Sequence, residues 1–209
     1  VDVLTTSSDN PQKSYKTLDD IRLKYGHVCS WAIWKKIDPK QKAKFGMDDL
    51  SFINNESINR NIILVGLNIS GKGNLEKPFS NFHPDYSTAH DYKIRYALEN
   101  TIFWGSYMTD VIKDYEEVIS NKVMKYLNNN PNFEKENIIS FEKELKYIGA
   151  NKPIIISFGN DSYKILKRNL GEKYQIYKVS HYSSCITKED LRHQFQVINE
   201  QINNISHSD

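Results

Sequence analysis

The sequence predicts an α/β fold: a three-layer sandwich in which helices cover both faces of a four-stranded, mainly parallel sheet. Apolar runs at residues 61–67, 106–112, 152–158 and 174–180 have the length and composition of buried strands. Helical patterns separate these runs along the chain. Strands that are apolar on both faces and alternate with helices are typical of a parallel sheet covered on both sides.

The N-terminal part begins with a polar arm at residues 1–13, rich in Ser, Thr, Asp and Asn. The remaining residues, 14–209, fit one domain of ordinary size. "TLDDIRLKYG" predicts a short helix, with Thr17 as N-cap, early acidic residues and Gly26 at the end. "HVCSWAIWKK" follows, and its two tryptophans are expected in the core.

The helical patterns after the first strand lie at 92–100, 116–127, 141–149 and 161–171, and a last helix runs from about Lys188 to Ile205. "NNNPN" at 128–132 is expected to be a loop between two helices. Ligands of parallel sheets bind beyond the carboxyl ends of the strands. The loops after the first, second and fourth strands are therefore where a site is expected.

Charge leaves a DNA partner open, and the cysteine content argues against several kinds of site. The 28 basic and 26 acidic residues give a net charge of +2, so an anionic partner requires a local patch. Cys29 and Cys185 are far apart and form no C-x-x-C pair, which argues against a zinc site, an iron–sulfur cluster or a disulfide framework. Residues 1–16 lack the apolar run of a signal peptide, and no segment is apolar for the length of a membrane span. A soluble, cytoplasmic monomer with reduced thiols is expected.

The first loop contains most of a phosphate-binding motif. In "GLNISGKGN", Gly66, Gly71 and Lys72 match G-x-x-x-x-G-K-[ST], but Gly73 stands where the pattern needs a hydroxyl for Mg²⁺. Two prolines follow closely, so a helix is not expected to begin at the lysine. A nucleotide-phosphate-binding enzyme is thus a residual alternative.

The same loop resembles a different family. Gly66-Leu67-Asn68-Ile69-Ser70 is similar to the G-[IM]-N-P-G motif of the mismatch-specific and single-strand-selective branches of the uracil-DNA glycosylase superfamily. "KPFSNF" resembles the family's Pro-Phe segment, and "YMTDVIK" its T-[ND]-hydrophobic-[VIL]-K segment. "SFGNDSYKIL" looks like its strand-to-helix turn, and His181-Tyr182-Ser183-Ser184 is similar to H-P-S. Ile69, Ser70 and Tyr182 depart from the family pattern.

The resemblance spans about 62–192 and implies a DNA glycosylase that excises an altered base by flipping it into a pocket. By motif position, Asn68 and His181 are the catalytic residues. Phe79, or else Phe82, stacks on the base, and Asp110 stands where the family often has a base-reading Asn. The implied substrate-binding residues are Gly66, Leu67, Phe79, Phe82, Asp110, Ser183 and Ser184.

Elementary chemistry supports these roles. Breaking an N-glycosidic bond places positive charge on the sugar and negative charge on the leaving base. The Asn68 amide can orient a water, His181 can donate to a base carbonyl, and an aromatic ring gives a flipped base a stacking surface. Plainer roles remain open: Asn68 as a turn residue, His181 and the phenylalanines as structural residues, and Asp110 as a buried cap or ion-pair partner.

A buried neutral carboxyl at Asp110 would suit a cytosine-like or modified cytosine base better than uracil. DNA is the expected partner, and phosphate contacts are expected from Lys72, Lys77, Lys188 and Arg192. His83, Asp85, His90 and Asp91 fit no metal-ligand spacing, so neither a metal nor another cofactor is expected. The main alternative is a non-catalytic nucleic-acid-binding or phage-defence module with the same fold.

Overall fold

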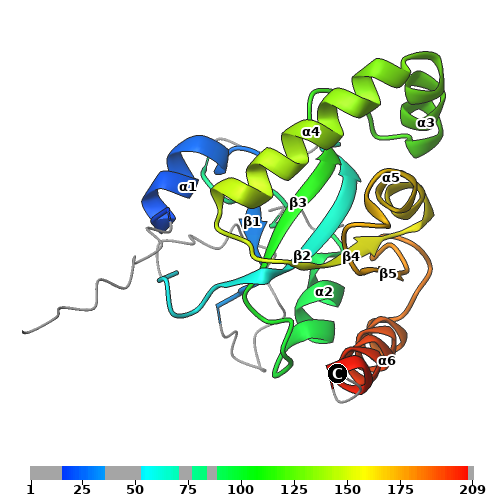
Figure 1. Ribbon diagram of the computed structural model, residues 1–209. Coiled ribbons are helices and arrows are strands. Elements are labelled where there is room, and N and C mark those ends of the chain that lie inside the picture. Colours follow the sequence, from blue (N-terminus) through cyan, green and yellow to red (C-terminus); the bar gives the residue numbers. More distant parts are fainter. Residues whose placement is uncertain (1–15, 36–52, 71–76, 84–88, 207–209) are drawn as a thin grey trace, which may run out of the picture.

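The computed structural model describes residues 16–35, 53–70, 77–83 and 89–206 (Figure 1). These residues form an α/β fold of six helices and five strands. In chain order the elements are α1 (Leu18–Tyr25), β1 (Ser30–Trp31), β2 (Asn59–Asn68), α2 (Asp91–Leu98), β3 (Ser106–Ile112), α3 (Ser120–Asn129), α4 (Pro131–Tyr147), β4 (Ile154–Phe158), α5 (Asn160–Leu170), β5 (Ile176–Val179) and α6 (Lys188–Ser206).

The strands form one mixed sheet in the order β1-β3-β2-β4-β5. β2 is parallel to both β3 and β4, and β4 is parallel to β5, as the alternation of strands and helices predicts. The predicted number of four strands is wrong, because β1 pairs antiparallel with β3 through Ser30↔Met108 and Trp31↔Tyr107. A two-residue strand is too short to leave a periodic pattern in the sequence.

Alternation along β2 divides the core between the two faces of the sheet. Ile63 and Val65 belong to a hydrophobic cluster with residues of α1, α3, α4 and α5. Ile62 and Leu64 belong to a second cluster with residues of α2 and α6. Because successive strand side chains point to opposite faces, both faces of β2 are buried, and α2 and α6 lie side by side over one of them (Figure 1).

Most predicted helices are confirmed, although several boundaries differ. Thr17 caps α1 as predicted, through a capping box with Asp20. α4 begins at Pro131, ten residues before the predicted start at 141, so the predicted loop at 128–132 shrinks to Asn130 between α3 and α4. Proline at the first helical position costs no hydrogen bond, so it starts this helix instead of interrupting it.

Several other expectations concern burial and segments outside the description. Trp31 and Trp34 are buried, as expected of core residues. Cys29 and Cys185 are free thiols, the first buried and the second exposed. The predicted arm at 1–13 lies outside the described residues. None of the described helices combines the length and apolar character needed to cross a membrane.

Candidate functional site

A cavity of about 990 Å³ lies where β2, β3 and β4 end and where the chain continues from β5. This is the carboxyl edge of the parallel strands, the edge at which the sequence predicts a site. The cavity brings together segments that are far apart in the chain. Among the predicted site residues, Gly66, Leu67, Asn68, Phe82, Asp110, His181, Ser183 and Ser184 line it.

Asn68, the last residue of β2, has an amide group in a defined orientation. Its Nδ2 donates to the carbonyl oxygens of Ile69 at 3.1 Å, Tyr115 at 3.0 Å and Glu117 at 2.9 Å. Carbonyl oxygens only accept hydrogen bonds, so the nitrogen must face them and Oδ1 must point elsewhere. The side chain therefore offers an acceptor at the cavity, which is the group that would orient a water.

His181 follows β5 and its hydrogen bonds define its tautomer. The backbone N–H of Ser183 donates to Nδ1 at 3.2 Å, and Ser183 Oγ lies 2.7 Å from the same nitrogen. Nδ1 is thus an acceptor and the proton lies on Nε2. Burial lowers the pKa of His181, which favours the neutral ring. A neutral imidazole with Nε2–H available can donate to a base carbonyl.

The His181 ring also has a fixed position. It stacks on Tyr182, with ring centroids 4.5 Å apart and an interplanar angle of 22°. A Cβ at Gly159 would lie 3.4 Å from His181 Cβ, so the turn after β4 approaches this residue closely. Ser184 Oγ donates to the His181 carbonyl at 2.6 Å, and Lys93 of α2 donates to the Ser184 carbonyl at 3.1 Å. These contacts hold the whole 181–184 turn.

Asp110, on β3, is 3% exposed. Burial raises the pKa of this carboxyl to about 6, against the opposing effects of the Asn81 hydrogen bond and of Lys113. Its Oδ1 occupies the space above Gly66 on the neighbouring strand, where a Cβ would lie 2.2 Å from it. Gly66 is therefore required by the position of Asp110, because any larger residue would displace the carboxyl from the cavity wall.

The two phenylalanines of "KPFSNF" have different positions, although both have left-handed backbones, with φ of 65° at Phe79 and 67° at Phe82. Phe79 is 1% exposed, packs edge-on against Trp31 and does not line the cavity. Phe82 does line it, and its ring atoms would lie 3.3 Å from a Cβ at Gly66. Of the two phenylalanines considered for stacking, the structure therefore places Phe82, the second choice from the sequence, and not Phe79 at the cavity.

Phe79 is drawn into the core by contacts that its motif does not reveal. Its N–H donates to the Gly26 carbonyl at 2.7 Å, and its carbonyl accepts from Ser30 Oγ at 2.7 Å. Ser30 belongs to β1, the strand that the sequence pattern missed. The position of this residue therefore depends on an element that the sequence did not predict.

Asn81 is a cavity residue that the sequence reasoning did not single out. Its Nδ2 donates to Asp110 Oδ2 at 2.9 Å and to the Val28 carbonyl at 2.9 Å. It lies within "KPFSNF", between the two phenylalanines that were considered. Its partner Asp110 is 29 positions away, so only the fold could indicate the role.

A buried ion pair lies behind Asp110. Lys113 Nζ is 2.7 Å from Glu144 Oε2 and donates to the Asp110 carbonyl at 2.6 Å. Tyr107 and Thr109 each donate to Glu144 Oε1 at 2.8 Å. A buried charge requires such partners. These contacts connect α4 to β3 and to Lys113, where the segment begins whose Tyr115 and Glu117 carbonyls accept from Asn68.

Of the four residues predicted to contact phosphate, the three that the structure describes do not line the cavity. Arg192 donates from Nη1 to the Tyr96 carbonyl at 2.9 Å and from Nη2 to the Glu99 carbonyl at 3.3 Å, so it connects α6 to the end of α2. Lys188 lies over the Tyr96 ring and, like the exposed Lys77, does not line the cavity. Lys72, with Gly71 and Gly73 of the phosphate-loop pattern, lies outside the described residues.

The histidines considered as metal ligands are separated in the fold. His83 is buried, with Nε2 3.0 Å from the Trp31 carbonyl and its ring against Trp34, and burial lowers its pKa to about 4. His90 lines the cavity instead, and Asp85 is not among the described residues. No group of three potential ligands gathers within the described part of the chain.

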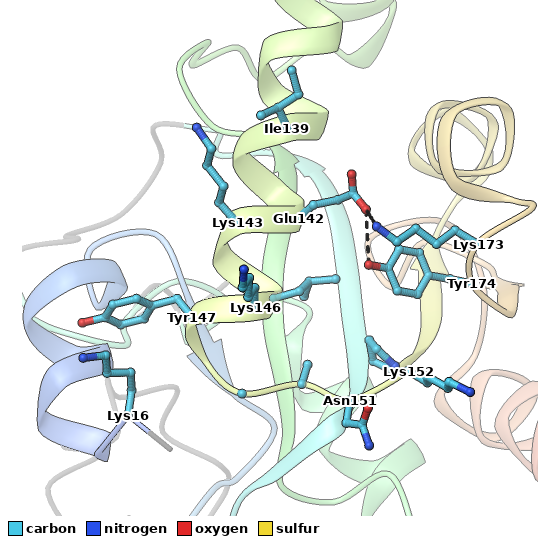
Figure 2. Close-up of a pocket in the computed structure, with 14 residues that line it drawn as sticks. Lys16, Ile139, Glu142, Lys143, Lys146, Tyr147, Asn151, Lys152, Lys173 and Tyr174 are labelled. Atoms are coloured by element: carbon cyan, nitrogen blue, oxygen red, sulfur yellow. Dashed lines mark hydrogen bonds and ion pairs between the residues drawn. The ribbon is translucent and has the colours of Figure 1, made fainter. Parts of the chain in front are cut away.

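A second hollow, of about 870 Å³, lies at the opposite edge of the sheet (Figure 2). It is formed by the end of α4, the segment before β4 and the residues before β5. Its rim carries the lysines Lys16, Lys143, Lys146, Lys152 and Lys173. Lys173 pairs with Glu142, which also accepts from Tyr174 at 3.3 Å. No His or Cys lines it among the described residues, whereas His90 and His181 line the first cavity.

Comparison with known proteins identifies no relative: no family model, no curated protein and no solved structure matches the chain. The glycosylase resemblance therefore depends on the motifs and on the geometry of the cavity that they line.

Proposed function

We propose that this chain is a DNA glycosylase that flips an altered pyrimidine base into the carboxyl-edge cavity and hydrolyses its N-glycosidic bond. The observation that carries the proposal is the convergence of Asn68, Asp110, His181 and Phe82 on one cavity. They come from three separate strand ends and from the 77–83 segment. The sequence motifs assign them the roles of water positioning, base reading, leaving-group stabilisation and stacking.

The arrangement of the fold agrees with the proposal. Three of the four parallel strands carry site residues at or after their carboxyl ends, and helices cover both faces of the sheet. This is the three-layer organisation that the resemblance implies. β1 is an addition at the edge of β3, and it supports the 77–83 segment through Ser30 and Phe79.

Neutral residues can carry the reaction. The bond between the sugar C1′ and the base nitrogen breaks, and the base leaves with the bonding electrons. The oxygen of a water held by Asn68 Oδ1 bonds to C1′, and this water releases a proton to solvent. His181 Nε2–H donates to the base carbonyl, where negative charge develops. The products are an abasic site and the free base, which takes up a proton.

The experiment is a strand-break assay. Oligonucleotides carrying single altered bases, both single-stranded and paired, are incubated with the protein and then treated with alkali, which breaks the chain at abasic sites. We expect breaks with at least one altered pyrimidine, and none with an Asn68→Ala, His181→Ala double variant of the same thermal stability. Binding without breaks would instead support a non-catalytic module.

A further inference from the structure

Three polar side chains form a row across the carboxyl-edge cavity, in an order that the sheet defines. His181 follows β5 at one end of the strand order, and Asp110 lies on β3 toward the other end. Asn81 lies beyond Asp110, because it also bonds the carbonyl of Val28, just before β1. A flat ligand lying along this row meets His181, Asp110 and Asn81 in turn.

The amide of Asn81 cannot change its orientation without cost. Its Nδ2 donates to the Val28 carbonyl and to Asp110 Oδ2, each at 2.9 Å. A rotated amide would turn its oxygen toward the carbonyl, which can only accept, and would leave that buried acceptor unpaired. The polar atom that remains for the cavity is Oδ1, so Asn81 offers a fixed acceptor.

The other two groups can both donate. His181 has its proton on Nε2, because Nδ1 accepts from Ser183. Asp110 receives the Asn81 hydrogen bond on Oδ2, while Oδ1 lies above Gly66 at the cavity wall. Burial raises the pKa of the carboxyl to about 6, which lowers the cost of placing one proton between Oδ1 and a ligand nitrogen.

Along this row, His181 offers a donor, Asp110 a proton that it can share and Asn81 an acceptor. The bases differ in how well their edges match this order. A cytosine base offers O2, N3 and the 4-amino group, which are acceptor, acceptor and donor. Uracil and thymine present N3–H in the middle and O4 at the end, so O4 would face Asn81 Oδ1. Guanine in the same orientation would place its 2-amino group at His181 and O6 at Asn81. Adenine has no carbonyl to accept from His181.

We infer that Asn81 is a specificity-determining residue that, together with Asp110 and His181, selects a base with a cytosine-type edge by accepting a hydrogen bond from its 4-amino group. This inference rests on the proposed glycosylase function. It assigns to Asn81 the discrimination between 4-amino and 4-oxo pyrimidines. It does not require a particular 5-substituent, which leaves room for modified cytosines as substrates.

Matched pairs of oligonucleotides isolate the 4-position. Cytosine with uracil, 5-methylcytosine with thymine, and 5-hydroxymethylcytosine with 5-hydroxymethyluracil differ within each pair only in the 4-amino or 4-oxo group. Single-turnover excision is measured for the wild type, Asn81→Leu and the control Asn128→Leu on the exposed surface of α3. In an excised pair the 4-amino member should react at least about tenfold faster, the usual effect of a mismatched polar edge.

The variants should differ in the ratio of the excision rate of the 4-amino base to that of its 4-oxo partner. Asn81→Leu should bring it toward one, and Asn128→Leu should leave it unchanged. Equal excision of both members by the wild type, or an unchanged ratio in a folded Asn81→Leu protein, would overturn the inference.

Failure of the glycosylase proposal would be seen separately, as the absence of strand breaks with every base. The preference for a cytosine-type base edge is then tested by measuring affinity for oligonucleotides that carry uncleavable 2′-fluoro-cytidine or 2′-fluoro-uridine. Wild-type protein should bind the cytidine form at least about tenfold more tightly. Equal affinity for the two would overturn the reading of the base edge.

Discussion

At the scale of single residues, the proposed site consists of side chains whose polar atoms have fixed directions. Asn68, Asn81 and His181 each use one end of the side chain to bond the protein, which leaves the other end for a ligand. Preorganised groups of this kind stabilise a transition state without reorientation during the reaction. Substitutions of Asn68 and His181 should therefore affect rates more than DNA affinity.

Asn68→Ala should lower the single-turnover rate by at least about a hundredfold while DNA binding persists, because positioning of the water acts mainly in the transition state. Rate and affinity are measured on the same oligonucleotide, and Asn128→Ala serves as the surface control. A nearly normal rate in the Asn68 variant would remove this residue from the mechanism.

His181→Ala should slow excision most for bases that are poor leaving groups, since a donor at the leaving base matters more as that base becomes harder to expel. Ser183→Ala should have a smaller effect, because the backbone N–H of Ser183 still defines the tautomer of His181. Rates are compared across a series of 5-substituted pyrimidines. Equal slowing of every base by His181→Ala would contradict the leaving-group role.

Asp110 predicts a dependence of stability on pH. Burial raises its pKa from the ordinary value of 3.8 to about 6, so between these values the folded protein binds more protons than the unfolded chain. Stability from this group is present at low pH and is lost as the pH rises through 6. The shift corresponds to about 3 kcal/mol, as an order of magnitude.

The test compares Asp110→Asn with the wild type, since other titrating groups such as His83 and Asp91 contribute equally to both proteins. Relative to the wild type, the free energy of unfolding of the variant should rise by about 2–3 kcal/mol between about pH 4 and pH 8. Urea denaturation at several pH values measures this difference. A constant difference would show that Asp110 has an ordinary pKa.

At the scale of elements, the 77–83 segment divides its two phenylalanines between the core and the cavity. The left-handed backbones of Phe79 and Phe82 cost roughly 1–3 kcal/mol each, as non-glycine residues in this region do. The contacts of Phe79 with Gly26 and Ser30, and of Asn81 with Val28 and Asp110, hold the segment in this conformation. The segment therefore depends on α1 and β1 for its shape.

Phe79→Ala should destabilise the protein by about 3–5 kcal/mol, the usual cost of removing a buried aromatic ring. Phe82→Ala should weaken excision of every accepted base, because stacking does not depend on base identity. Thermal unfolding and single-turnover rates separate the two effects. A Phe82 variant with normal rates on all bases would show that Phe82 does not stack on the base.

At the scale of the whole molecule, one sheet edge carries the proposed chemistry and the opposite edge carries the lysine-rimmed hollow. The two hydrophobic clusters hold the strands between them, so the strand ends at the carboxyl edge share one support. In the proposed mechanism His181 stabilises the leaving base and Asn68 orients the water.

Treatment with EDTA should therefore leave excision unchanged, as expected of a mechanism in which His181 and Asn68 supply the stabilising contacts. Rates are measured after dialysis against the chelator and again after addition of Mg²⁺, Mn²⁺ or Zn²⁺. Loss of activity that one ion restores would bring back a metal-dependent mechanism.

The sequence by itself predicted four of the five described strands, their parallel direction and the sheet edge at which the candidate cavity lies. Apolar runs, helix caps and strand-end motifs are local signals, and they place Gly66, Asn68, Asp110 and His181 at or just after strand ends. The same local signals predicted α1 with its cap at Thr17. These features depend on neighbours within a few positions, which a single sequence displays directly.

Only the tertiary structure decided which groups meet across the sheet. β1 is two residues long, and its pairing with β3 and its contact with Phe79 join positions 49 or more apart. The bond from Asn81 to Asp110, the carboxyl above Gly66 and the tautomer of His181 likewise arise from packing or local geometry. Sequence patterns report periodicity and turn chemistry, whereas the direction of a polar atom depends on partners that only the folded chain brings within reach.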